Sequence, residues 1–261
     1  MSHLRATGIV KRFGGIKALD GAAVDVVPGR ITGLIGRNGS GKSTLFNCIT
    51  GFLKPDEGAV TLDGEDITGL SPDKAAGRGL VRSFQTPRVY PKATVRDAVV
   101  CGFFPSTRNS FLGTILGLPG LHREERDLRQ RTDHILESFE LLHLAETEVG
   151  RLSMGIVRLV EVARGMASGA RYLLLDEPAA GLSREERTVL CDQVSRLAAT
   201  GVGVLIVEHN FPLIRSLCDS VTVLDFGSVL ASGSPEAVAA DWAVIDAYLG
   251  SGSDAESGVT A

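Results

Sequence analysis

The chain has 261 residues, of which 44% are hydrophobic and 22% charged, a composition typical of an ordinary globular protein. Its 27 basic and 31 acidic residues give a net charge of −4, which provides no general electrostatic attraction to nucleic acid or anionic lipid. The 31 glycines exceed the usual share and indicate tight turns or backbone that approaches a ligand closely.

No segment predicts a cleavable signal peptide or a membrane-spanning helix. The first ten residues, MSHLRATGIV, lack an apolar region, and the apolar window at 99–121 is interrupted by two prolines and Arg108. The cysteines are far apart and form no CxxC pair, so we expect reduced, buried thiols rather than a structural zinc site. These cysteines are Cys48, Cys101, Cys191 and Cys218.

Short apolar runs alternate with amphipathic stretches along the chain. The runs predict β-strands at 22–27, 30–36, 59–64, 171–177, 202–209 and 219–225. Residues 183–200 predict a helix that begins with a Ser cap and has glutamates two and three residues later. Strand, helix and strand in this order indicate an α/β fold with parallel pairing.

Residues 94–166 differ from the rest of the chain, because no convincing strand follows Val100 and residues 122–144 have a charged amphipathic helix pattern. We interpret this part as a helical subdomain inserted into the α/β core. The predicted organisation is a nucleotide-binding core at 1–93, the helical subdomain at 94–166, the rest of the core at 167–250 and a disordered tail at 251–261.

The stretch GRNGSGKST fits the pattern G-x-x-x-x-G-K-[ST], which predicts a phosphate-binding loop. A predicted strand precedes it and a helix closed by Gly51 follows it, so that backbone N–H groups and the helix N-terminus face the anion. We expect Lys42 to reach the β- and γ-phosphates and Ser43 to bind Mg²⁺. The alternative, a glycine-rich turn without a ligand, is disfavoured by this context. The predicted nucleotide-binding residues of the loop are Gly36, Arg37, Asn38, Gly39, Ser40, Gly41, Lys42, Ser43 and Thr44.

Four further polar residues extend this prediction. In YLLLDEP, Asp176 stands at the end of an apolar strand, where it can hold the Mg²⁺ shell, and Glu177 follows at the place of an attacking water. His209 ends another predicted strand and is a candidate to contact the γ-phosphate, with a structural histidine as the alternative. Gln85 is a candidate to sense Mg²⁺ or water, with an ordinary loop amide as the alternative.

Residues 152–156, LSMGI, resemble the LSGGQ signature of ABC-type ATPases, with Ile156 in place of Gln. The phosphate loop, Gln85, LSMGI, LLLDEP and His209 stand in one order, and over about residues 4–250 this order resembles the nucleotide-binding subunits of ABC transporters. The resemblance implies a P-loop NTPase (ABC ATPase) core of the α/β class, with an antiparallel β subdomain and an inserted helical subdomain.

The resemblance also implies the role of each residue. Lys42 and Ser43 correspond to the Walker A motif, Asp176 to Walker B, Glu177 to the general base, His209 to the switch histidine and Gln85 to the Q-loop, with Ser43, Gln85 and Asp176 around Mg²⁺. Phe13 matches the aromatic residue that stacks on adenine, and a core phenylalanine is the alternative.

In the family, the signature binds the γ-phosphate of ATP held by the opposite subunit. Ser153 offers a hydroxyl, Gly155 offers close backbone approach, and the residues after them continue as a helix, so we predict a working variant, with a degenerate half-site as the alternative. Ser183 replaces the Asp of the D-loop, which favours a pair with a second, different ATPase.

The sequences KRFGGIKALDG, RSFQTPRVYPKATVRDAV and IDAYLG look like the ATP-binding subunit of branched-chain amino acid importers. Importers of urea or short amides are the alternative within the family. The resemblance implies ATP and Mg²⁺, membrane permease subunits, a second ABC ATPase subunit, indirectly a periplasmic or extracellular solute-binding protein, and a peripheral location at the cytoplasmic face of the membrane. Two other classes remain open, a soluble ABC-type ATPase acting on DNA or ribosomes and a P-loop small-molecule kinase, although we expect no binding to nucleic acid.

Overall fold

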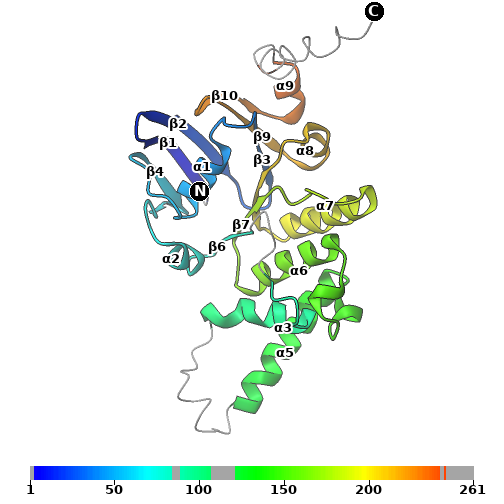
Figure 1. Cartoon of the computed structure of the whole chain (residues 1–261). Helices are drawn as coiled ribbons and strands as arrows, with labels where there is room; N and C mark the ends of the chain where they lie inside the picture. The colour runs from blue at the N-terminus through cyan, green and yellow to red at the C-terminus, as the bar shows by residue number, and fades with distance from the viewer. Residues whose placement is uncertain (1–2, 84–88, 107–120, 242–243, 245–261) are drawn as a thin grey trace, which may run out of the picture. The chain divides into compact units, whose positions relative to one another are not determined.

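The computed structural model describes residues 3–83, 89–106, 121–241 and 244, and the chain divides into two compact units (Figure 1). The first, called here the loop unit, comprises Met1–Ala75 and Ala198–Ala261. The second, called here the helical unit, comprises Ala76–Leu197. Each unit contains its own strands and helices and is described by itself.

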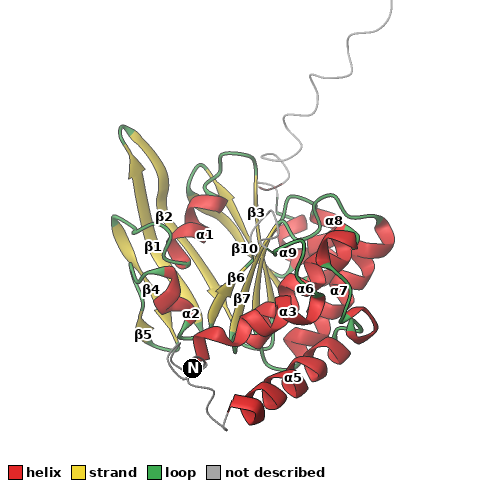
Figure 2. Ribbon diagram, turned by 60° about the horizontal axis from the view of Figure 1, so that its bottom comes forward, coloured by secondary structure: helices red, strands yellow, loops and turns green. Residues whose placement is uncertain are grey.

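The loop unit contains an antiparallel sheet with the strand order β2-β1-β4-β5 (Figure 2). Its strands are β1 (Leu4–Phe13), β2 (Ile16–Val26), β4 (Glu57–Leu62) and β5 (Glu65–Asp66). Two glycines join β1 to β2, and Gly14 adopts a φ of 57° in the left-handed region that favours glycine. One face of the sheet is buried through apolar residues such as Leu4, Ile9 and Leu19. This sheet is the expected antiparallel β subdomain.

The remaining strands of the loop unit pair mainly in parallel. β3 (Ile31–Gly36) pairs in parallel with β8 (Gly203–Val207) and β9 (Ser220–Asp225), and β10 (Ser228–Gly233) pairs antiparallel with β9. Every residue of β3 and β8 is buried, as expected for strands that are covered on both faces. The predicted strands at 30–36, 202–209 and 219–225 are thereby confirmed, and the carboxyl ends of β3 and β8 lie at the same sheet edge.

The helices of the loop unit are short. α1 (Lys42–Ile49) follows the glycine-rich loop and ends before Gly51, whose φ of 77° closes the helix as predicted. α8 (Phe211–Leu217) begins after Asn210, whose side chain accepts a hydrogen bond from the Leu213 N–H. α9 (Pro235–Ala239) is capped in the same way by Ser234. α2 (Pro72–Ala76) completes the set.

The helical unit has two parallel strands, β6 (Leu80–Arg82) and β7 (Tyr172–Asp176). Its α-helices are α3 (Val95–Val100), α5 (Leu121–Ser138), α6 (Met154–Ala167) and α7 (Arg184–Ala199), and its 3₁₀ helices are η1 (Cys101–Ser106), η2 (Leu142–Leu144) and η3 (Val149–Arg151). α3, α5 and α6 lie side by side (Figure 2). A Cβ atom at Gly102 would lie 2.2 Å from the Arg164 carbonyl oxygen, so η1 packs against the backbone of α6. The division of the sequence at 93, 166 and 250 stays a prediction.

The helix predicted at 122–144 is shorter than expected. α5 ends at Ser138, and Glu140 adopts a φ of 59° in the left-handed region. The Glu140 N–H donates to the Glu137 carbonyl at 3.0 Å and the Leu141 N–H donates to the Leu136 carbonyl at 2.7 Å, which is the pair of bonds that ends a helix in a Schellman motif. This stop has no local signal in the sequence, because a glutamate rather than a glycine stands at the left-handed position.

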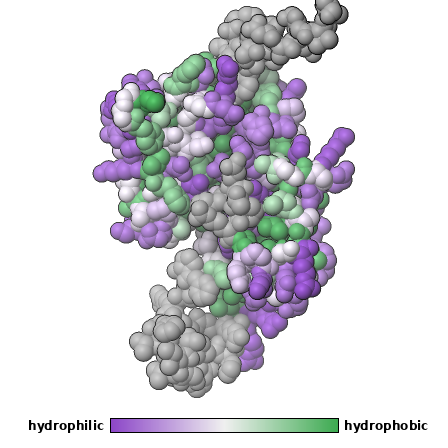
Figure 3. All heavy atoms as spheres, in the orientation of Figure 1, coloured by the Kyte–Doolittle hydropathy of each residue, from purple (hydrophilic) through white to green (hydrophobic). Residues whose placement is uncertain are grey.

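The surface of the described residues mixes hydrophilic and hydrophobic side chains on the face drawn in Figure 3. None of the helices in the described ranges is both long and apolar enough to cross a membrane. All four cysteines are free; Cys48 and Cys218 are buried as expected, whereas Cys101 is exposed and Cys191 is half-buried. The expectation of buried thiols is therefore wrong for Cys101, which lies on the short 3₁₀ helix η1 rather than in the core.

Candidate functional site

The glycine-rich loop connects β3 to α1 in the loop unit. The Lys42 ammonium turns back over the loop and donates to the carbonyl oxygens of Gly36 at 2.7 Å and of Arg37 at 2.9 Å. Gly41 occupies the N-cap of α1 with a φ of 103°, and no side chain of the described residues caps this helix. A helix N-terminus without a capping side chain presents its first backbone N–H groups to an anion, which is the arrangement that binds a phosphate.

Steric contacts explain two glycines of the loop. A Cβ atom at Gly36 would lie 2.3 Å from the Ser40 hydroxyl oxygen and 2.4 Å from the Leu224 carbonyl oxygen. A Cβ atom at Gly41 would lie 2.8 Å from the Ala18 carbonyl oxygen, in addition to the left-handed strain. Neither position admits a side chain without a shift of backbone, so the loop shape depends on both glycines.

The loop also contains a buried hydroxyl group without a protein partner. Ser40 is 3% exposed, and its Oγ has no hydrogen-bond partner among the described residues. A cavity of about 200 Å³ lies against it, lined by residues of the loop and of the turn after β9: Arg37, Asn38, Gly39, Ser40, Asp225 and Phe226. An unsatisfied buried hydroxyl beside an uncapped helix N-terminus fits a phosphate group, because the phosphate supplies the missing acceptors.

The acidic pair of the helical unit stands at the end of β7, of which the first four residues are buried. The Asp176 carboxylate lies 3.8 Å from the Arg82 guanidinium, and the Asp176 N–H donates to the Ser83 hydroxyl at 3.3 Å. Glu177 adopts a φ of 45°, a left-handed conformation that is uncommon and strained for a glutamate. The strand end thus presents two half-buried carboxylates in succession, with the second fixed in an unusual backbone geometry.

His209 lies two residues beyond β8 in the loop unit. Its side chain is 64% exposed, whereas the preceding Glu208 is 2% exposed. The Glu208 carboxylate accepts a hydrogen bond from the His209 N–H at 3.3 Å and lies 3.9 Å from His209 Nδ1. The Asn210 cap of α8 follows at once, so His209 lies between a buried carboxylate and a helix start with its imidazole largely exposed.

Phe13 ends β1 and is 47% exposed. The Lys11 ammonium lies 5.8 Å from the centre of its ring, and the same ammonium donates to the Asp56 carboxylate at 2.9 Å. A core phenylalanine, which was the alternative, would be buried. The exposed ring face is therefore open to stack against a planar group.

The segment LSMGI leads into α6 of the helical unit. Ser153 is the N-cap of this helix, and its hydroxyl oxygen accepts from the Ile156 N–H at 3.5 Å. The Gly155 N–H donates instead to the carboxylate of Glu186, at 3.3 Å. Ile156 is half-buried and Met154 is half-exposed. The sequence identified Ser153 and Gly155, but nothing in it pointed to Glu186, which is 31 residues away along the chain.

The predicted residues fall into both units. Phe13, the loop at 36–44 and His209 belong to the loop unit, and Ser153, Gly155, Asp176 and Glu177 belong to the helical unit. Gln85 lies outside the described residues. Ser83, two residues earlier, accepts a hydrogen bond from the Asp176 N–H, and Arg82 lies near the Asp176 carboxylate. Neither residue was predicted from the sequence to belong to the site.

This chain is similar to a known protein family over most of its length. The family model described as "ABC transporter" matches residues 19–180. The chain belongs to the ABC transporter family. A second family model, described as "Branched-chain amino acid ATP-binding cassette transporter", matches residues 228–254 of this ABC protein.

Curated ABC relatives are similar to this chain over nearly its full length. The high-affinity branched-chain amino acid transport ATP-binding protein BraF of Pseudomonas aeruginosa is 38% identical, with 95% of this chain and 97% of the relative covered. The probable branched-chain amino acid transport ATP-binding protein LivG of Methanocaldococcus jannaschii is 37% identical, with 96% and 98% covered. LivG of Escherichia coli K12 is 34% identical, with 95% and 97% covered.

Solved structures of ABC cassettes have the same fold. A cassette of an ABC transporter in its ADP conformation has a TM-score of 0.83 at 36% identity, with 96% of this chain and 99% of that chain covered. A nucleotide-free cassette from an ABC transporter has a TM-score of 0.82 at 36% identity, with 95% and 99% covered. The predicted P-loop ABC ATPase fold is therefore confirmed.

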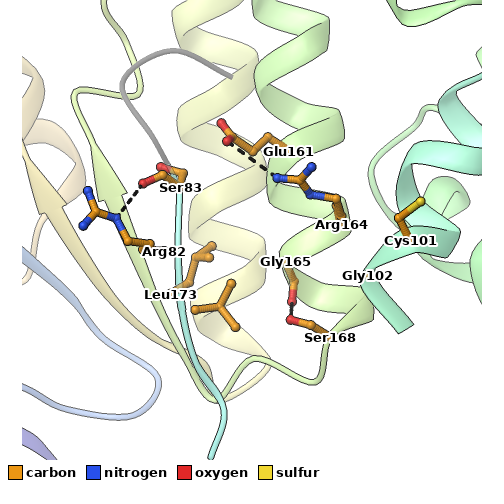
Figure 4. Close-up of a pocket in the computed structure, with 10 residues that line it drawn as sticks. Arg82, Ser83, Cys101, Gly102, Glu161, Arg164, Gly165, Ser168 and Leu173 are labelled. Carbon is orange, nitrogen blue, oxygen red and sulfur yellow. Dashed lines mark hydrogen bonds and ion pairs between the residues drawn. The ribbon is translucent and has the colours of Figure 1, made fainter. Parts of the chain in front are cut away.

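The helical unit of this ABC protein also has a cavity of about 270 Å³ beside α6 (Figure 4). The Glu161 carboxylate, which is 3% exposed, lies 3.2 Å from the Arg158 guanidinium and 3.9 Å from that of Arg164. Cys101 is one of the residues that line the cavity. Since Arg82 and Ser83 also line it, the cavity borders the residues that contact Asp176.

Proposed function

We propose that this chain is the ATP-hydrolysing motor subunit of an ABC importer that serves branched-chain amino acids. The observation that carries the proposal is the uncapped glycine-rich loop between β3 and α1, with the buried, unpartnered Ser40 hydroxyl beside it, in a chain of the ABC transporter family. A small-molecule kinase would explain the loop but not the LSMGI segment.

Residues of the loop unit bind the phosphates and the base of the nucleotide, and Asp176 of the helical unit contributes to the metal site. The N–H groups of the loop and of α1 surround the phosphates, and Lys42 exchanges its two carbonyl acceptors for phosphate oxygens. Ser43 and Asp176 supply oxygen ligands of the kind that a hard divalent cation prefers. Mg²⁺, when bound with ATP, neutralises charge on the β- and γ-phosphates. Phe13 stacks on the adenine through its exposed ring.

Glu177 and His209 act at the γ-phosphate. Glu177 accepts the proton of the attacking water from its position directly after β7, where its backbone has a φ of 45°. His209 contacts the γ-phosphate through its exposed imidazole, which the buried Glu208 orients through the backbone. Gln85 completes the Mg²⁺ and water contacts in this proposal.

The signature acts on ATP held by a second ATPase subunit. Ser153 and the Gly155 N–H, at the N-terminus of α6, donate to the γ-phosphate of that ATP. Gln at the fifth position is not needed for either contact, so Ile156 leaves them intact. Ser183 in place of Asp favours a partner that differs from this chain.

The relatives' names and the match at 228–254 support branched-chain amino acids as the solute. Permease subunits in the membrane and a separate solute-binding protein bind that solute, and this chain works at the cytoplasmic face. ATP lies between this chain and the second ATPase subunit. Closure of the two subunits around ATP moves the permeases, and hydrolysis lets the two subunits separate again. The net charge of −4 argues against a role on DNA or ribosomes.

Glu177→Gln tests the catalytic role. We expect the variant to bind ATP as the wild type does and to hydrolyse it at least about 10²-fold more slowly, as the loss of a general base should cost. Binding is measured with a fluorescent ATP analogue, and turnover from phosphate release. Glu185→Gln, which removes an exposed carboxylate at the start of α7, is the control. Unchanged turnover in Glu177→Gln would remove the general base from this proposal.

Purification of the tagged chain from its own detergent-solubilised membranes tests which proteins it assembles with. We expect two multi-spanning permeases and a second short ATPase to be identified by mass spectrometry in the purified complex. Recovery of the chain alone, or with ribosomal or DNA-repair proteins, would contradict the importer assignment while leaving the ATPase assignment in place.

A further inference from the structure

Glu186 joins the start of α7 to the signature at the start of α6, both in the helical unit. One carboxylate oxygen, Oε1, accepts from the Gly155 N–H at 3.3 Å, and the other, Oε2, accepts from the Ser183 N–H at 3.0 Å. Interaction of the carboxylate with the Ser153 side chain is the largest of the causes that hold the pKa of Glu186 below its ordinary value. The side chain is thus held ionised by donors of both helix starts.

The contact between Glu186 and the signature is close. A Cβ atom at Gly155 would lie 2.8 Å from the Cβ, Cγ and Cδ atoms of Glu186. The carboxylate therefore rests against the bare backbone at Gly155, at the point where a helix N-terminus attracts an anion. Any larger residue at 155 would displace Glu186 from this position.

The donors that hold Glu186 are the donors that the proposed function assigns to the γ-phosphate. The Ser153 hydroxyl and the Gly155 N–H each have one hydrogen to give, so they cannot serve a carboxylate and a phosphate together. We propose that the carboxylate of Glu186 is an internal stand-in for the γ-phosphate. The carboxylate occupies the signature until ATP on the partner subunit displaces it. This inference rests on the proposed function.

Release of the carboxylate leaves the start of α7 in place. The Glu186 N–H donates to the Ser183 hydroxyl at 3.1 Å, a bond that does not involve the carboxylate. That bond and the carboxylate bond to the Ser183 N–H together form a capping box, and the first of them persists when the side chain turns away. The displaced carboxylate then faces solvent, where its charge is hydrated.

The stand-in raises the ATP concentration that the two ATPase subunits need to close around ATP. Closure must break the bonds of Glu186 to the signature, and the carboxylate repels the incoming γ-phosphate as long as it stays near. In the open state the same bonds satisfy the N-terminus of α6. Glu186 therefore favours the open state and sets a threshold for closure, so it is a positioning residue and not a catalytic one.

The test uses the intact transporter complex, purified through this chain, with Glu186→Gln in place of the wild type. Gln keeps the capping box but carries no charge. We expect the ATP concentration for half-maximal hydrolysis to fall by about two- to fivefold, the range that corresponds to one charge near an exposed helix N-terminus, while maximal turnover does not fall. Glu185→Gln, the adjacent exposed glutamate, is the matched control and should leave this concentration unchanged.

The outcomes separate the two claims. A wild-type complex that does not hydrolyse ATP overturns the proposed function. If the wild-type complex hydrolyses ATP normally and the ATP requirement of Glu186→Gln is unchanged or raised, only the stand-in is overturned. A residue that merely supports the signature would lower activity when replaced, which is opposite to the effect that we expect.

A second measurement needs neither the partner nor hydrolysis. In the nucleotide-free full chain, amide hydrogen exchange at residues 152–156 reports whether Gly155 is protected. We expect faster exchange there in Glu186→Ala than in the wild type, and no change in Glu185→Ala. Equal exchange in all three proteins would show that the carboxylate does not occupy the signature, and would overturn the inference.

Discussion

Gly51 and Gly64 have the same backbone conformation but different surroundings. Their φ angles are 77° and 87°, yet a Cβ atom at Gly51 would lie 2.0 Å from the Leu70 carbonyl oxygen, whereas at Gly64 it would meet nothing within 4 Å. We expect Gly64→Ala to lower the free energy of unfolding by about 1 kcal/mol through left-handed strain alone. Gly51→Ala should cost about 2 kcal/mol more, because a backbone atom must move. Urea unfolding of both variants measures the difference, and equal losses would contradict the steric account.

Individual residues differ in how far their sequence context predicts their role. The loop at 36–44 was predictable because glycines, lysine and the flanking strand and helix are all local in sequence. The left-handed Glu177 was not, because a glutamate gives no local sign of positive φ. Nor was the contact between Glu186 and Gly155, since it joins two helix starts that are distant along the chain.

The end of α5 is set by one residue in an unfavourable conformation. Glu140 has a φ of 59°, where glycine is at ease and a glutamate is strained. We expect Glu140→Gly to raise the free energy of unfolding by about 0.5–1 kcal/mol. The exposed ion pair between Glu140 and Arg196, at 2.7 Å, contributes little and does not reverse this gain. Glu140→Ala loses the same ion pair without relief of strain, so it should not stabilise the protein. Urea unfolding midpoints of the two variants decide, and a stabilised Glu140→Ala would contradict the explanation.

Elements were predicted well where burial on both faces produces a continuous apolar run or where a capping box marks a helix start, and poorly elsewhere. The runs at 171–177, 202–209 and 219–225 are buried strands, and their continuous apolar character was enough to find them. The helix at 183–200 was found from its capping box, which the structure contains between Ser183 and Glu186. By contrast, the strand β10 and the short helices α8 and α9 are largely set by tertiary contacts and by caps, and the sequence pattern did not single them out.

At the scale of the whole chain, the order of the motifs predicted the family better than any motif by itself. LSMGI departs from the signature at two of its five positions and would carry little meaning alone. Its place between the phosphate loop and LLLDEP gave it meaning, because an ABC ATPase requires all of these segments in this order. The three-dimensional relation of phosphate loop and signature was not predictable from order, since one belongs to the loop unit and the other to the helical unit.

Nucleotide binding should stabilise the full chain by mass action. A ligand that binds only the folded state at about 100 times its Kd adds about 2.7 kcal/mol to the free energy of unfolding. We therefore expect saturating Mg²⁺ and ATP to raise the melting temperature of the chain in a Glu177→Gln background, which keeps the nucleotide intact. Adding Lys42→Ala should abolish most of this rise, because the ammonium that lies over the loop is lost.

Lys74→Ala removes an exposed positive charge on α2 and is the control for the loss of a cation. The quantity compared is the shift caused by the nucleotide and not the melting temperature itself, since Lys42 is 8% exposed and its replacement also changes the stability of the free protein. Calorimetry of the three proteins, with and without Mg²⁺ and ATP, gives these shifts. If Lys42→Ala and Lys74→Ala respond equally to the nucleotide, ATP binds elsewhere than at the glycine-rich loop.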